Sequence, residues 1–123
     1  MSAYRIIGGD VGTTLVFTVR EWPIGTAPDP YTAAPVVNLA SATSLRLILI
    51  PPPPVLSQGV RQQTVVATLY TDGTDGKIQY TTVSGDIPAL AFNSQPQRWN
   101  VRPQFTLSGW SGKGEPDYFM VDP

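Results

Sequence analysis

The segment QRWNVRPQFTLS, from Gln97 to Ser108, decides the fold of this chain. Polar residues alternate there with a set of apolar ones: Trp99, Val101, Pro103, Phe105 and Leu107. Alternation with a period of two is typical of a β-strand that buries one face and exposes the other. Proline has no backbone N–H to donate, so Pro103 inside this strand predicts a sheet edge or a β-bulge.

Several other segments have the same period and predict strands that pack around the first. They are Tyr4 to Ile7, Thr13 to Arg20, Val36 to Leu39, Ser44 to Ile50, Val60 to Thr71, Lys77 to Thr82 and Asp117 to Val121. Two Asp-Gly pairs at 72–76 predict a hairpin, whereas Leu107 to Pro116 is rich in glycine and predicts a turn. No segment of helical length has apolar residues at three-four spacing. The pattern therefore predicts an all-β protein, an antiparallel β-sandwich of about seven or eight strands.

Proline marks two further features of the chain. Ser44 to Ile50, SLRLILI, is apolar on both faces, which indicates either a central strand or a strand whose second face is covered by a partner. Pro51 to Pro54 end it. Glu21 to Pro35 holds four prolines in fifteen residues, and this predicts a long surface loop, either a plain connection or a contact-forming arm.

Length and composition predict a single domain, 1–123, with residues 21–35 as a proline-rich loop insertion. The chain has no cysteine and no histidine, which removes disulfides, thiolate metal sites and the commonest general base. Eight basic and nine acidic residues are spread without runs, so no nucleic-acid footprint is indicated. No signal peptide and no membrane span is predicted. We expect a protein that is not an enzyme and uses no cofactor or metal.

The acidic cluster at 72–76 is a candidate calcium loop. Asp72 and Asp75 lie beside Gly73 and Gly76, but two carboxylates without a bidentate glutamate fall short of a calcium ligand set. Turn formation by Asp and Gly explains the same residues and is the favoured interpretation.

Taken together, a series of short motifs spans nearly the whole chain. In order they are Gly9-Asp10 before TTLVFTV, the turn 38–43 (NLASAT) before SLRLILI, 72–80 (DGTDGKIQY), 85–87 (GDI), Arg98-Trp99, a turn at Trp110, and 118–121 (YFMV). This combination resembles the N-terminal domain of phage baseplate upper proteins, an immunoglobulin-like sandwich family of tailed phages. The chain departs from the family pattern in its insertion at 21–35 and in 93–97, where a glycine usually stands shortly before the tryptophan.

The resemblance implies an immunoglobulin-like fold and a non-enzymatic structural component of a tailed-phage virion: a tail, baseplate, neck or fibre-attachment adaptor. Such a protein would assemble in the host cytoplasm and dock on other virion proteins as a homo-oligomeric ring or as repeated copies. The alternatives are a carbohydrate-binding adhesion module that binds a host glycan and a capsid decoration protein. The candidate contact residues are Trp22, Ile24, Tyr31, Pro52, Pro53, Arg98, Arg102 and Trp110.

Overall fold

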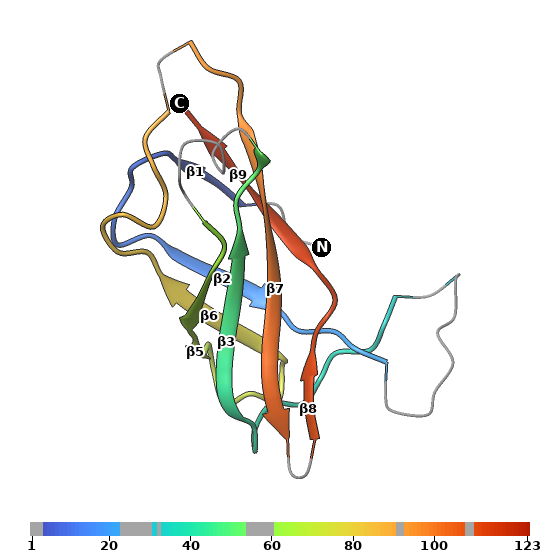
Figure 1. Cartoon of the computed structure of the whole chain (residues 1–123). Helices are drawn as coiled ribbons and strands as arrows, with labels where there is room; N and C mark the ends of the chain where they lie inside the picture. The colour runs from blue at the N-terminus through green and yellow to red at the C-terminus, as the bar shows by residue number, and fades with distance from the viewer. Residues whose placement is uncertain (1–3, 23–30, 32, 54–60, 91–92, 108–109) are drawn as a thin grey trace.

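The computed structural model describes residues 4–22, 31, 33–53, 61–90, 93–107 and 110–123, which form two β-sheets in a sandwich-like arrangement (Figure 1). The strands of this part of the chain are β1 Tyr4–Ile7, β2 Thr14–Thr18, β3 Thr43–Ile50, β4 Gln63–Val66, β5 Thr68–Leu69, β6 Lys77–Thr81, β7 Gln97–Leu107, β8 Trp110–Lys113 and β9 Asp117–Asp122. The prediction of an all-β protein is confirmed.

The larger sheet has the strand order β1-β9-β7-β3-β4, and β8 pairs with the end of β7; the smaller sheet has the order β2-β6-β5. Every pair is antiparallel except β1 with β9, which is parallel. The expected purely antiparallel arrangement is therefore wrong at this one edge. Strand β3 lies between β7 and β4, so its apolar second face belongs to a strand inside the sheet.

The core lies between the facing sides of the two sheets and follows the period-two pattern. Its largest fully buried side chains are Trp99, Phe17, Phe105, Phe119, Leu15, Leu39, Leu47, Leu49, Ile78, Val19 and Val101. The rings of Trp99 and Phe119 stack with centroids 5.9 Å apart and planes inclined by 25°. The apolar face of β7 is thus sandwich core, as the alternation predicted.

Pro103 lies inside the sheet, opposite a bulge. Strand β7 is central, with β3 on one side and β8 and β9 on the other, so the prediction of an edge is wrong. Gln104 pairs with Lys113, and Val101 pairs with Asp117. The three residues 114–116 therefore lie opposite the two residues 102 and 103 of β7. The Pro103 carbonyl accepts the Gly114 N–H, and the missing proline N–H therefore points toward this interrupted ladder.

Three strand boundaries differ from the sequence prediction. Trp110–Lys113 is a strand, β8, because its backbone pairs with the end of β7 whatever its side chains. Val36 forms only an isolated bridge with Arg20, so the predicted edge strand at 36–39 is wrong. The predicted strand at 60–71 is divided at Ala67, with β4 in the larger sheet and β5 in the smaller.

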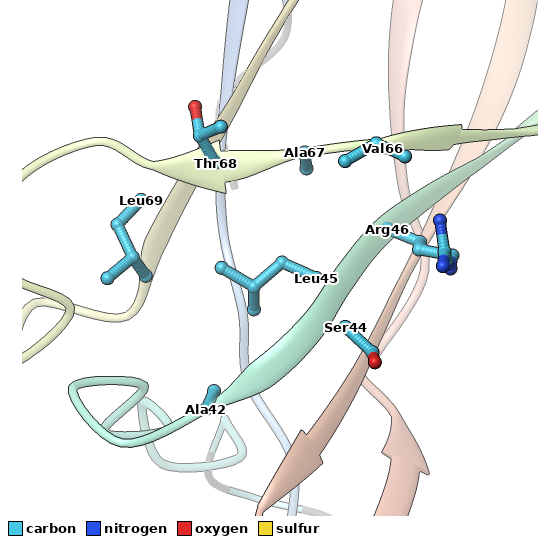
Figure 2. A pocket seen from close by; sticks show the side chains of 8 residues that line it. All are labelled: Ala42, Ser44, Leu45, Arg46, Val66, Ala67, Thr68 and Leu69. Atoms are coloured by element: carbon cyan, nitrogen blue, oxygen red, sulfur yellow. The ribbon is translucent and has the colours of Figure 1, made fainter.

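The division at Ala67 follows from its hydrogen bonds. The Ala67 N–H donates to Leu45 of β3, whereas the Tyr70 N–H donates to Lys77 of β6, so the chain changes sheets between them. Beyond Ala67 the chain and β3 diverge, and Leu45 and Leu69 point into the gap (Figure 2). A hollow of about 420 Å³ opens there, lined by Ala42, Ser44, Leu45, Arg46, Val66, Ala67, Thr68 and Leu69.

A buried carboxylate joins the two sheets at one end. Asp86 accepts hydrogen bonds from the Tyr80 hydroxyl of β6 at 2.6 Å, from the Val83 N–H at 2.9 Å and from the Gln63 amide of β4 at 3.2 Å. Burial and these contacts with Asp86 raise the pKa of Tyr80 well above its ordinary value. The cluster ties the start of β4 to the smaller sheet.

Candidate protein-interaction surface

The polar side chains of β7 lie on the side of the larger sheet that faces away from the core, which we call the outer face. Cross-strand pairing arranges this face in rows that run across the sheet. The rows are Arg5–Met120–Arg98, then Tyr118–Asn100–Ile50, then Arg102–Ile48–Thr64, and last Lys113–Gln104–Arg46–Val66. No strand or helix of the described residues packs over these rows.

The outer face concentrates the positive charge of the chain. It carries five of the eight basic residues, namely Arg5, Arg46, Arg98, Arg102 and Lys113. The paired positions of the face hold one acid, Asp122, opposite Ile7. A protein with a formal charge of -1 thus presents one strongly cationic surface, because its described acidic residues lie mostly in turns and at strand ends.

Two contacts fix side chains at one side of this face. Arg5 forms a two-point ion pair with Asp122, Nη2 to Oδ1 at 2.6 Å and Nε to Oδ2 at 3.1 Å, and this contact raises the pKa of Arg5. The Arg98 guanidinium lies over the Tyr118 ring, 4.0 Å from its centroid, a cation–π geometry. Arg98 is therefore held in place while its N–H groups stay exposed.

The remaining cations of the outer face are available to a partner. Within the described part of the chain, Arg46, Arg102 and Lys113 make no hydrogen bond or ion pair. Between them lies Ile48, which is 7% exposed. Arginine presents paired donors that match the geometry of a carboxylate. Arg, Tyr and Met are enriched in protein interfaces, so the composition of this face suits contact with a protein. The arginines favour a partner surface that carries carboxylates.

Among the predicted contact residues that the structure describes, Arg98 and Arg102 lie together on the outer face, both exposed on one side of β7. Trp22 is half-buried, and Tyr31 is 94% exposed, but neither belongs to the outer face. Pro52 and Pro53 follow the end of β3.

Ile24 and the side chain of Trp110 lie outside the described residues, although the backbone of Trp110 pairs with Leu107. A glycan platform requires exposed aromatic rings, and Trp99 is 1% exposed in the core. The carbohydrate-binding alternative stays a prediction with no aromatic pair to support it among the described residues.

Sequence reasoning missed Arg5, Arg46 and Lys113 as members of the same surface. The alternation in SLRLILI already places Arg46 opposite the leucines, which was the available signal. That Arg46 lies in a row with Gln104 and Lys113 depends on the order β3-β7-β8, which local patterns do not specify.

The acidic cluster at 72–76 is a turn whose carboxylates are engaged by the chain itself. Asp72 accepts from the side chain and the N–H of Thr74, and these bonds lower its pKa. Asp75 accepts from the Lys77 N–H and the Thr71 hydroxyl, which likewise lower its pKa. Nowhere in the described ranges do three or more metal-ligating acids gather. The geometry is that of a capped hairpin turn.

Comparison of the chain with family models, with curated proteins and with solved structures gives no match. The resemblance to baseplate upper proteins stays a prediction from the sequence motifs. Among the described residues, none forms a helix with the length and hydrophobicity that crossing a membrane requires.

Proposed function

We propose that this protein is a non-enzymatic docking module that binds acidic surfaces of partner proteins through the outer face of its larger sheet. The observation that carries the proposal is the concentration of basic residues there, with Arg46, Arg102 and Lys113 unpaired within the described chain. The half-buried Ile50 and Met120 lie among the charged side chains of this sheet face, a mixture that favours a protein partner over a small molecule, which binds in a concave site.

The fold class of the proposal is immunoglobulin-like. The order β9-β7-β3-β4 in one sheet and β2-β6-β5 in the other corresponds to the G-F-C-C′ and B-E-D arrangement of variable-type immunoglobulin domains. In this assignment β4 is C′ and β5 is D, β8 and β9 are successive parts of strand G, and β1 lies beside β9 at the edge of the sheet.

The biological setting of the proposal is a tailed-phage virion, in which the chain joins tail, baseplate, neck or fibre components as repeated copies. This placement rests on the sequence resemblance, and the cationic face adds a surface by which each copy would be held. Acidic partner surfaces would also speed association, because opposite charges steer the encounter.

Mass spectrometry of purified phage particles, produced from the genome that encodes this chain, tests the placement. We expect the polypeptide in the particles at a fixed ratio to the other structural proteins. Particles that are infectious and complete without it would refute the placement. Charge reversal of Arg98 and Arg102 tests the docking face separately.

A further inference from the structure

The outer edge of β4 lacks the charged side chains and the proline that commonly protect a strand edge. No strand in the described part of the chain pairs with β4 on the side away from β3. Since the Ala67 N–H points to β3, the backbone groups of Thr64 and Val66 point outward. The segment 62–70, QQTVVATLY, has no charge and no proline, and Val66 is 65% exposed.

The opposite edge of the same sheet is protected. There β1 carries Arg5, ion-paired with Asp122 of β9, and charged side chains at an edge are a common device against unwanted pairing. The two edges of the larger sheet thus differ in charge: β1 carries a charged side chain and β4 carries none. The difference leaves β4 as the less protected of the two edges.

Charge selects the occupant of this edge. In the last row of the outer face, Lys113–Gln104–Arg46–Val66, an added strand would place its own side chain next to Val66. That position is two strand spacings, about 10 Å, from Arg46, a distance that Arg46 and a Glu side chain together can span. Arg46 has no partner in the described chain and borders the hollow beside Val66 (Figure 2).

A second copy of this chain fits the edge less well. Pairing β4 with β4 of another molecule would join two cationic outer faces into one surface of a single sign, which is unfavourable. The contact would also extend over only four residues per copy.

We propose that the β4 edge binds a short extended segment of a partner protein that carries acidic side chains on its outward side. Pairing would involve the outward N–H and C=O groups of Thr64 and Val66. It would end at Thr68, because β6 occupies this side of the chain from there on. The inference deepens the proposed docking function and rests on it, since the same partner would cover the outer face.

Binding of a blocked synthetic peptide, TEVEVET, tests the inference by NMR on the isotope-labelled chain, with the charge-reversed peptide TKVKVKT as control. We expect the acidic peptide to shift the amide signals of Thr64 and Val66 and the control peptide to leave them unchanged. Val66→Pro removes an outward N–H without breaking a bond to β3, so it should weaken the peptide about tenfold. Val66→Thr should bind like the wild type.

Three outcomes would overturn the inference: shifts confined to Arg98 and Arg102, unchanged binding by Val66→Pro, or the same shifts on concentrating the chain alone, which would indicate a second copy. Thr64→Pro replaces Val66→Pro if the latter melts below the assay temperature. If the acidic peptide does not shift the β4 amide signals of the wild-type chain while that chain still docks to particles, the edge is refuted and the proposed function stands.

Discussion

The buried carboxylate of Asp86 gives the most specific stability prediction of this structure. Asp86→Ala removes the acceptor of the Tyr80 hydroxyl, the Val83 N–H and the Gln63 amide at once. Hydrogen bonds to a charged group contribute about 1.5–3 kcal/mol each, and the variant avoids the cost of burying the carboxylate. The two short bonds dominate, so we expect a loss of about 3 kcal/mol in the free energy of unfolding.

Urea denaturation followed by tryptophan fluorescence measures this loss, since Trp99 lies in the core. For a domain of this size, 3 kcal/mol corresponds to a decrease in melting temperature of about 10 °C. Tyr80→Phe is the matched control: it removes one of the three donors and should cost about 1.5 kcal/mol. If Asp86→Ala costs no more than Tyr80→Phe, the carboxylate does not join the sheets and the reasoning is wrong.

Three further predictions concern the turns and the ionisable groups. Gly73→Ala and Gly76→Ala should each destabilise the chain by about 2 kcal/mol or more, because both glycines have positive φ. An added Cβ would meet the backbone of Leu39 and Ala40 at Gly73, and the side chain of Val36 at Gly76. Gly85→Ala, also at positive φ but with open space around it, should cost only about 1 kcal/mol in the same denaturation assay. Folding raises the pKa of Tyr80, so the stabilising contribution of this hydroxyl is complete below pH 10 and is lost as the pH rises toward the pKa of the folded state. Thermal melts from pH 9 to 12 should therefore show a steeper loss of stability for wild type than for Tyr80→Phe. Millimolar calcium should not raise the melting temperature, since Asp72 and Asp75 are engaged by their own turn; a calcium-dependent increase that Asp72→Asn abolishes would contradict this.

Local patterns in the sequence predicted much of this fold. Alternation along β7 placed Trp99, Val101 and Phe105 in the core, and the Asp-Gly pairs marked the β5–β6 hairpin, because burial and turn chemistry depend on neighbouring residues.

Features that depend on distant pairing were missed. The segment Trp110–Lys113 has no strand pattern. It becomes a strand only because β7 continues beyond Val101, where its pairing with β9 stops, and pairs with this segment from Gln104 to Leu107. Pro103 was expected at an edge or a bulge, and the choice depended on the three residues that bulge opposite it. The outer face was predicted only in part for the same reason: its charges come from five different strands, β1, β3, β7, β8 and β9.

The central claim is that the outer face holds the protein to its partners, and a charge-reversal experiment tests it most directly. The double variant Arg98→Glu with Arg102→Glu is compared with a matched control off this face, Arg61→Glu with Lys77→Glu, after both are shown to fold. The measured quantity is the amount of each variant that enters phage particles, determined by quantitative mass spectrometry. We predict at least a tenfold decrease for the first variant, equivalent to about 1.4 kcal/mol, and wild-type incorporation for the control. Wild-type incorporation of a folded Arg98→Glu, Arg102→Glu variant would contradict the claim.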